Sequence, residues 1–435
     1  MAEQRCALEN MELITASDQS PKIVDTPGPC RICGAPLSVT FCDLGTTPLS
    51  NSYITREQLR AGKEQLYPLH AYVCAKCKLV QIEAFETPEA IFSDYAYFSS
   101  YAATLLEHAE RYSEMITHRL GMKPANSLVV EIASNDGYLL RNFVQNGFRV
   151  LGVEPAQNVA RVAREGGIPT ETVFFGGKTA GSLRDSYGSA DLMVANNVIA
   201  HVPDLHDFID GFRVMLAPAG TATIEFPYLL HLMQQTQFDT IYHEHFSYFA
   251  LAPLLEAFHM HELEIVDVDE ISTHGGSLRI YVRHRKGARQ APSIARMLQE
   301  ERAAGLEETS TYVAFQARVE NTRDEFLAFL RDTKEKGLTV AAYGAPAKGS
   351  TFLNYCGVGI ESLPYTVDIS PHKQGHLLPG VHIPIYGPER IYETKPDRIV
   401  VLAWNLIAEI KRQLQDVATW GGRLVVAIPR LRVID

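Results

Sequence analysis

The middle of the chain alternates apolar runs with helical patterns. Apolar runs at 127–134, 149–155, 190–198 and 220–227 each end in turn or polar residues, and helical patterns such as "NVARVAREG" separate them. Strands that alternate with helices predict a mostly parallel sheet with helices on both faces. We therefore expect residues 101–285 to form a doubly wound, Rossmann-like α/β domain.

A second, smaller Rossmann-like α/β domain is predicted over residues 337–435. The stretch "GLTVAAYGAPAKGS" begins it as a strand, a turn and a helix, and strand candidates follow at "YTVDIS", "RIVVLAW" and "RLVVAIP". Between the two units, residues 286–336 are predicted to form a helical linker with one apolar face. The apolar positions of that face are Tyr312, Phe315, Val319, Phe326 and Leu330.

Composition bounds the class of protein. A chain of 435 residues is too long for one ordinary core, and 46% hydrophobic with 21% charged residues is typical of a folded protein. The net charge of −11 argues against a nucleic-acid partner, because neutralising phosphates needs a basic surface. No apolar run reaches the roughly 18 residues that a membrane span needs.

The first 25 residues lack the basic start and apolar middle of a signal peptide. We expect residues 1–25 to be a mobile leader and the protein to be cytoplasmic. Nothing in the sequence requires more than a monomer.

Four of the seven cysteines form two C-x-x-C pairs, "CRIC" and "CAKC", within a turn-rich module at 26–100. Two such pairs are the usual frame for zinc with four thiolate ligands, which holds structure because no position stays open for water. We therefore predict a structural Zn²⁺, with free thiols as the alternative. The expected ligands are Cys30, Cys33, Cys74 and Cys77. Cys42 stays an alternative ligand, and Cys6 and Cys356 are expected to be bystanders.

The strand–turn–helix pattern "VVEIASNDGYLLRNF" predicts a nucleoside site. Glu131 lies near the end of the first strand, and Glu154 ends the second strand 23 residues later, where an acidic residue hydrogen-bonds ribose. S-adenosylmethionine is favoured over a dinucleotide, because "ASNDG" lacks the G-x-G-x-x-G pyrophosphate cradle; a structural turn is the alternative. The cofactor-binding candidates at this sheet edge are Glu131, Ser134, Asn135, Gly137, Glu154, Pro155, Asn196 and Asn197.

The stretch "TIYHEHFSYF" (240–249) concentrates histidine, glutamate and aromatic residues. His243 and His245 lie two apart, which points their side chains to one side of a strand but to opposite sides of a helix. The pattern is not H-E-x-x-H, so a metal site is disfavoured here. His201, in "NNVIAHVPD", follows a predicted strand, although a lone histidine is more often structural than catalytic.

A series of motifs resembles the bacterial sugar C-methyltransferase family, which acts on nucleotide-linked 4-keto-6-deoxy sugars. In order, from about residue 28 to the end, these motifs are the double "CxxC", "DYAYFSSY", "EIASNDGYLL", "GVEP", "NNVIAHVPD", "YHEHFSYF", "GGSLR", "YGAPAKG" and "VDISPHKQG". The resemblance implies a zinc-binding module, a class I methyltransferase domain and a second Rossmann-like domain. It also implies S-adenosylmethionine as the methyl donor.

The resemblance places Tyr242, Glu244, His245 and His201 in the active site. A carbon next to a ketone becomes a nucleophile only after it loses a proton, and histidine accepts protons near neutral pH. His245 is therefore expected to be the base, Tyr242 to orient or stabilise the 4-keto oxygen, and Glu244 to fix the imidazole or bind sugar. His201 could donate to the enolate oxygen. An irregular loop is required, since a regular strand would split these side chains between two faces.

On the substrate side, the resemblance implies that Tyr97 contacts the methyl donor and the sugar, and that Lys348 and Arg279 contact phosphate or sugar. A structural turn and a strand-end charge are the alternatives for the last two. Phe174 and Phe175 could sandwich adenine or pack in the core. The expected nucleotide is thymidine diphosphate, and the expected carbon is C-3 rather than C-5.

The sequence leaves two other classes of function open. One is an NAD-dependent sugar-nucleotide oxidoreductase or epimerase, which would use the C-terminal unit but lacks the dinucleotide glycine pattern. The other is a zinc-ribbon protein that docks other macromolecules.

Overall fold

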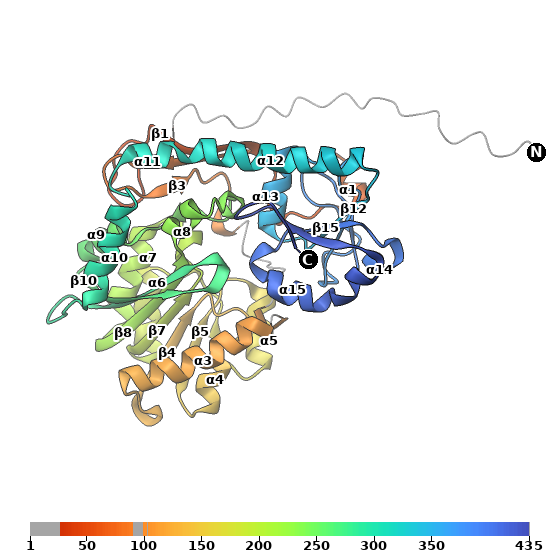
Figure 1. Cartoon of the computed structure of the whole chain (residues 1–435). Coiled ribbons are helices and arrows are strands. Elements are labelled where there is room, and N and C mark those ends of the chain that lie inside the picture. The colour runs from red at the N-terminus through yellow and green to blue at the C-terminus, as the bar shows by residue number, and fades with distance from the viewer. Residues whose placement is uncertain (1–26, 90–98, 102, 435) are drawn as a thin grey trace, which may run out of the picture.

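The computed structural model describes residues 27–89, 99–101 and 103–434. The described residues form three sheets joined and covered by helices (Figure 1). The expected leader, 1–25, and Tyr97 lie outside the described residues.

The N-terminal sheet is antiparallel and has the order β1-β2-β3-β9. Its strands are β1 (Val39–Thr47), β2 (Tyr67–Val73), β3 (Val80–Ile82) and β9 (Ser247–Tyr248), and a short helix, α1 (Arg56–Arg60), follows β1. The last strand belongs to the "YHEHFSYF" segment, because Tyr248 pairs with Val80 and Ser247 with Gln81. The segment with the candidate catalytic residues is therefore tied into the cysteine-bearing module.

The central sheet has seven strands in the order β10-β11-β8-β7-β4-β5-β6. Five of them run parallel: β4 (Leu128–Ile132), β5 (Arg149–Val153), β6 (Thr170–Glu171), β7 (Ala190–Asn196) and β8 (Leu216–Pro227). A hairpin of β10 (Leu263–Ile271) and β11 (Ser277–His284) extends the sheet, and β11 runs antiparallel to both neighbours. The chain reverses direction across the sheet between β4 and β7, so a ligand crevice is expected at their carboxyl ends.

Helices cover both faces of this sheet, as the alternating pattern predicts. They are α3 (Ala103–Leu120), α4 (Leu140–Gln145), α5 (Gln157–Glu165), α6 (Gly177–Tyr187), α7 (Leu205–Met215), α8 (Leu229–Gln234) and α9 (Leu251–Met260).

The C-terminal sheet has the order β14-β13-β12-β15-β16-β17, and its strands run parallel except the last. The strands are β12 (Val340–Tyr343), β13 (Thr366–Val367), β14 (Ile385–Tyr386), β15 (Arg398–Val401), β16 (Arg423–Val426) and β17 (Arg432–Ile434). Its helices are α13 (Ala347–Cys356), α14 (Glu389–Thr394) and α15 (Ile407–Gln413). This unit is a second Rossmann-like domain.

The predicted linker is a set of helices, called the brace below, that packs against the other modules. It forms α10 (Pro292–Ala303), α11 (Thr309–Val313) and α12 (Phe315–Glu335), and α12 runs along the N-terminal module toward the C-terminal domain (Figure 1). Phe315 stacks on Phe41 of β1 with ring centroids 4.6 Å apart, and Phe326 lies 4.8 Å from Phe352 of α13. One hydrophobic core includes residues of all three sheets, so the modules are held in fixed relation to one another.

Candidate active site and zinc site

The two C-x-x-C pairs form the same kind of turn. In the first, the N–H of Gly34 donates to the carbonyl of Cys30 at 2.9 Å; in the second, the N–H of Lys78 donates to the carbonyl of Cys74 at 3.0 Å. The residue after each pair has a positive φ, 68° at Gly34 and 64° at Lys78. The turn requires this left-handed residue, which glycine adopts without strain and lysine adopts at some cost.

The four thiols of these turns meet at one point. The Sγ atoms of Cys30, Cys33, Cys74 and Cys77 all lie within 4.8 Å of one another. A tetrahedral zinc with bonds of about 2.3 Å needs sulfur atoms about 3.8 Å apart, so the set fits Zn²⁺. Cys42 does not belong to the cluster and is fully buried in β1, where burial raises the pKa of its thiol far above the usual range. The alternative that Cys42 is a ligand is therefore wrong.

The carboxyl edge of the central sheet carries buried polar atoms without partners. Among the described residues, Glu131 Oε2, Ser134 Oγ and Asp136 Oδ1 are buried and make no hydrogen bond. Buried polar atoms are normally paired, so this edge fits a polar ligand. Burial raises the pKa of Glu131 well above its usual range, and the carboxylates of Glu154 and Asp136 raise it further.

Glu154 directly follows β5 and clasps the first βα turn. Its Oε2 accepts the N–H of Asn135 at 2.9 Å, and its Oε1 accepts the N–H of Ala156 at 2.9 Å. Each carboxylate oxygen keeps a second lone pair, which is what a ribose hydroxyl needs. Gly137 has a φ of 78°, and a Cβ there would lie 2.8 Å from Ile168 Cγ1, so the turn requires glycine.

Asn196 ends β7 at the same edge, next to β4. Both polar atoms of its amide are buried without a hydrogen bond in the described part of the chain. Asn197 follows with a φ of 57°, and its N–H donates to the carbonyl of Glu225 at 2.8 Å. With Pro155 beside Glu154, the fold brings the cofactor-binding candidates to one edge of the sheet. Their contacts with S-adenosylmethionine stay predictions.

A tight turn joins Tyr242 and His245. The N–H of His245 donates to the carbonyl of Tyr242 at 2.9 Å, and this closes a turn over the four residues of "YHEH". The hydroxyl of Tyr242 lies 2.8 Å from Nε2 of His245, and their rings are 4.1 Å apart. The Nδ1 of His245 lies 3.0 Å from the carbonyl of Thr240. Because a carbonyl only accepts, Nδ1 carries the proton and Nε2 of the neutral ring is the acceptor.

His243 does not join this pair. Its ring is buried, and its Nε2–H donates to the carbonyl of Pro68 at 3.1 Å in β2. Burial lowers the pKa of His243 to about 4, so the ring stays neutral. The two histidines of "YHEH" thus point apart, and only His245 faces Tyr242.

His201 lies beside His245, at the end of the short 3₁₀ helix Ile199–His201. The two rings meet edge to face with centroids 4.6 Å apart. The Nδ1–H of His201 donates to the backbone carbonyl of Glu244 at 2.7 Å. Burial lowers the pKa of His201 to about 4, so its Nε2 is an acceptor at neutral pH.

Glu244 points its carboxylate at the N-terminal module. Both of its oxygens accept from Nδ2 of Asn51, at 2.9 and 2.8 Å. The side chain is 3% exposed, and burial raises its pKa to about 7 although the Asn51 hydrogen bonds lower it. Among the described residues, the imidazole that Glu244 fixes is that of His201, and the contact is made by the backbone carbonyl of Glu244.

The C-terminal domain meets the same region through its first βα turn. Tyr53 donates its hydroxyl to the carbonyl of Ala345 at 2.6 Å, and Nζ of Lys373 donates to the same carbonyl at 2.9 Å. Asp368 accepts the N–H of Ala345 at 2.7 Å and that of Ser370 at 2.9 Å. This clasp repeats the one that Glu154 makes in the central domain, at the carboxyl end of the second strand.

Lys348 already has partners at a domain interface. Its Nζ donates to Oδ1 of Asn405 at 2.9 Å and lies 4.8 Å from the ring centroid of Trp404. The indole N–H of Trp404 donates to buried Asp239 at 2.7 Å. Burial raises the pKa of Asp239 to about 6, and the positive charge of Lys348 opposes this shift. Trp404, with Lys348 beside it, thus joins the C-terminal domain to the segment that precedes Tyr242.

Arg279 forms a buried ion pair across β8 and β11. Its Nε donates to Oε1 of Glu225 at 2.7 Å, and its guanidinium lies 4.7 Å from the ring centroid of Tyr112. The His108 ring lies 3.1 Å from the same carboxylate. The charge of Arg279 is used inside the fold, which favours the strand-bound alternative over a substrate contact.

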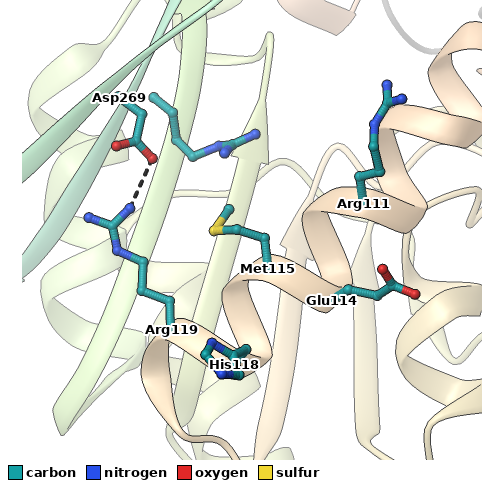
Figure 2. Close-up of a pocket in the computed structure, with 7 residues that line it drawn as sticks. Arg111, Glu114, Met115, His118, Arg119 and Asp269 are labelled. Atoms are coloured by element: carbon teal, nitrogen blue, oxygen red, sulfur yellow. Dashed lines mark hydrogen bonds and ion pairs between the residues drawn. The ribbon is translucent and has the colours of Figure 1, made fainter.

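Arg279 also lines an open cavity of about 700 Å³ on α3 (Figure 2). The other lining residues are Arg111, Glu114, Met115, His118, Arg119 and Asp269. Arg119 donates to Asp269 at 2.9 Å, so the cationic groups are partly neutralised. This cavity is separate from the Tyr242–His245 pair, which does not line it.

Phe175 packs in the core, with ring centroids 5.8 Å from Phe208 and 5.4 Å from Phe212. Of the two alternatives for this position, core packing is the observed one. Its neighbour Phe174 is half-buried.

Sequence reasoning missed residues that the tertiary structure brings to the site. Asp368 had a signal, because it lies 24 residues after Gly344, much as Glu154 lies 23 residues after Glu131. Asn51 had none: it lies in the turn-rich stretch "GTTPLSNSY", and 193 positions separate it from Glu244.

The doubly wound sheet and the acidic clasp at its carboxyl edge are typical of Rossmann-like, S-adenosylmethionine-dependent methyltransferases. Three family models match the chain: "Putative zinc binding domain" at residues 30–92, "Methyltransferase domain" at 105–268 and "C-methyltransferase C-terminal domain" at 272–429. The chain is also 38% identical over 407 residues to the C-methyltransferase NovU of Streptomyces niveus. The aligned region covers 93% of this chain and 96% of NovU. The chain belongs to the C-methyltransferase family.

Solved methyltransferases show weaker likeness. Magnesium protoporphyrin IX methyltransferase from Synechocystis PCC 6803 is 14% identical to this chain, with a TM-score of 0.31. The matched region covers 41% of this chain and 80% of that enzyme's chain. An S-adenosylmethionine-dependent methyltransferase from Clostridium acetobutylicum ATCC 824 is 10% identical with a TM-score of 0.33, over 41% of this chain and 91% of its own. Likeness at this level says nothing about substrate.

Family membership confirms the expected fold class, methyl donor and zinc-binding module. It favours the methyltransferase over the two alternative classes, the NAD-dependent oxidoreductase and the zinc-ribbon protein that docks other macromolecules. In the described part of the chain, no helix has the length and apolar character needed to cross a membrane.

Proposed function

We propose that this C-methyltransferase methylates a nucleotide-linked 4-keto-6-deoxy sugar, carried on thymidine diphosphate, at C-3 next to the ketone. The observation that carries the proposal is the Tyr242–His245 pair, which offers a proton acceptor and a hydroxyl donor in one turn. The choice of sugar, nucleotide and carbon rests on the sequence motifs shared with the sugar C-methyltransferase family.

His245 is the base in this proposal. The carbonyl of Thr240 holds the proton on Nδ1, so the Nε2 lone pair, which accepts from the Tyr242 hydroxyl in this structure, takes the proton from the sugar carbon when that hydroxyl turns away. As Nε2 takes that proton, the Tyr242 hydroxyl is released to donate to the 4-keto oxygen. That hydrogen bond stabilises the negative charge as the enolate forms.

His201 is assigned another role than donation to the enolate oxygen, which the sequence suggested. Its Nδ1–H is used by the carbonyl of Glu244, and burial disfavours a second proton on the ring. A neutral ring in this state does not donate to an enolate oxygen, so we assign His201 as an acceptor for a hydroxyl or amino group of the sugar. The Glu244 carboxylate is assigned the same kind of contact.

The methyl-donor side uses the edge of the central sheet. Bound S-adenosylmethionine supplies a methyl group on a sulfonium, an electrophile for the sugar carbanion. Glu154 would hold its ribose hydroxyls. The polar atoms of Glu131, Ser134, Asp136 and Asn196 that have no hydrogen-bond partner among the described residues would bind the rest. Tyr97 stays a proposed contact of both ligands.

The sugar-nucleotide side uses the C-terminal domain. The Asp368 clasp has the geometry of the Glu154 clasp, which suits a second ribose. Lys373 beside it supplies a cation for the diphosphate, and it also lies 3.7 Å from Asp368. Because Tyr53 and Lys373 share the Ala345 carbonyl, a nucleotide bound here lies at the junction of the modules.

A panel of 4-keto-6-deoxy sugar nucleotides tests the proposal. Each is incubated with the enzyme and S-adenosylmethionine, and with the enzyme in heavy water, and products are read by mass spectrometry and NMR. We expect a mass gain of one methyl group and deuterium uptake at C-3. Uptake at C-5 would move the reacting carbon, and no reaction with any member would refute the substrate class.

A further inference from the structure

A loop of the zinc-binding module reaches the candidate active site. Asn51 follows β1 and donates its side-chain Nδ2 to both carboxylate oxygens of Glu244, at 2.9 and 2.8 Å. A carboxylate only accepts, so the amide orientation is fixed by chemistry, with Oδ1 turned away. That oxygen lies 3.4 Å from the hydroxyl of Tyr53. A four-thiolate zinc module thus contributes a side chain to the catalytic region.

The hydrogen bonds of Asn51 replace those that water would make to the Glu244 carboxylate, which the fold buries. Glu244 is 3% exposed. Two influences set its pKa, burial first and then the Asn51 hydrogen bonds. The titratable neighbours are His201, bonded to the backbone carbonyl of Glu244, and the adjacent His243 and His245. All three are histidines, and burial keeps His201 and His243 neutral at pH 7.

Both ends of Glu244 are therefore held. Its side chain is bonded to Asn51, and its carbonyl accepts Nδ1–H of His201 at 2.7 Å. A hydrogen bond to the charged form of an acid favours ionisation. Loss of the Asn51 bonds would leave a buried carboxyl that is more easily protonated and free to change rotamer.

We propose that Asn51 is a positioning residue of the methyl-transfer site, which fixes the rotamer of the buried Glu244 carboxylate through two hydrogen bonds. This inference rests on the proposed function only for its activity readout. It gives the zinc-binding module a part in catalysis: zinc fixes the fold that presents Asn51 across 193 positions of sequence.

The test compares Asn51→Ala and Asn51→Asp with wild type, with Ser52→Ala as matched control on the same exposed loop. Zinc content and S-adenosylmethionine affinity are measured first and should match wild type. In Asn51→Ala, kcat should fall roughly tenfold, and the acidic limb of the pH–rate profile should move to higher pH, because Glu244 loses the bonds that favour its charge. Ser52→Ala should follow wild type.

Asn51→Asp gives an opposite signature. Two facing carboxyl groups must share a proton, so the substituted side chain can donate to Glu244 only in its protonated form. The activity of this variant relative to wild type should be higher at pH 6 than at pH 8. A wild-type pH profile in both variants overturns the proposal. If Asn51→Ala does not fold, the Asn51→Asp profile alone decides.

A second readout does not need the substrate. The Asn51→Ala, Glu244→Gln and double variants form a mutant cycle in urea unfolding at pH 8. We expect the effect of Asn51→Ala to shrink when Glu244 is already replaced by Gln, since the charged partner is gone. Additive effects would overturn the contact. An inactive wild-type enzyme with a coupled cycle would refute the proposed substrate and leave the Asn51–Glu244 contact standing.

Discussion

The Tyr242 hydroxyl lies 2.8 Å from Nε2 of His245, and the backbone N–H of His245 closes the turn between them. The same turn sends His243 into the core beside β2. A short irregular segment thus separates two histidines that the sequence places two positions apart. It gives one of them a hydroxyl partner and the other a structural part.

Replacing His245 by Ala should abolish deuterium exchange and methyl transfer, while S-adenosylmethionine still binds, because the methyl-donor edge lies on other strands.

Replacing Tyr242 by Phe should leave exchange measurable and lower kcat by about 10²-fold, since only a hydrogen-bond donor is lost. Exchange is followed by NMR in heavy water and binding by calorimetry. If His245→Ala still exchanges, His201 becomes the candidate base, and His201→Ala should then abolish exchange.

Replacing Cys74 by Ser should release the zinc and lower the thermal stability of the whole chain, since the zinc-binding module shares one core with both other sheets. Cys42→Ala is the matched control: it removes a buried thiol outside the cluster. We expect one zinc per chain in the control and none in Cys74→Ser, measured by metal analysis. Zinc loss in Cys42→Ala would contradict the assigned ligand set.

Replacing Glu154 by Ala should weaken S-adenosylmethionine binding at least about tenfold. The substitution removes the acceptor for two backbone N–H groups and for the ribose hydroxyls. Glu171→Ala is the control, because Glu171 ends the neighbouring strand β6 and bonds Tyr187. Calorimetric titration measures both. Equal losses in the two variants would show a general effect of this sheet edge.

Replacing Glu244 by Gln should make stability less dependent on pH. The pKa of Glu244 is about 7 in the fold and near 4.5 when unfolded, so the fold holds an extra proton between these values. Its contribution is complete below pH 4.5 and is lost as pH rises through 7, worth on the order of 3 kcal/mol by pH 8. In urea unfolding, the free energy of unfolding of Glu244→Gln relative to that of wild type should be higher at pH 8 than at pH 5. The same free-energy difference between variant and wild type at both pH values would contradict a raised pKa for the buried Glu244 carboxyl.

Replacing Gly275 by Ala should loosen the contact with the C-terminal domain. A Cβ at Gly275 would lie 2.6 Å from Cη2 of Trp404, whereas a Cβ at Gly188 would meet nothing within 4 Å. Both glycines have φ near 90°, 92° and 91°, so backbone strain is matched. Gly275→Ala should therefore cost about 1–3 kcal/mol more than Gly188→Ala in denaturant unfolding. Equal losses would mean that Trp404 adapts.

The pattern of apolar runs predicted strands β4, β5, β7 and β8 of the central sheet and β12, β13, β15 and β16 of the C-terminal sheet, because a buried parallel strand must be apolar on both faces. The short strands β14 and β17 were not predicted. The pattern also placed Glu131 and Glu154 at one edge, since the carboxyl ends of parallel strands meet there. The hairpin of β10 and β11 was not predicted. Its residues include Glu264, Asp267 and Asp269, which face partners or solvent and break the apolar signal.

Features that repeat locally could be read from the chain alone: two C-x-x-C turns, two strand–turn–helix units and an amphipathic brace. Each depends on residues within a few positions of one another, so spacing and residue type were sufficient. Which side chains meet was settled by the folded molecule. Asn51 meets Glu244, Trp404 meets Asp239 and Arg279 meets Glu225, because packing of one continuous core brings together segments that no local pattern relates.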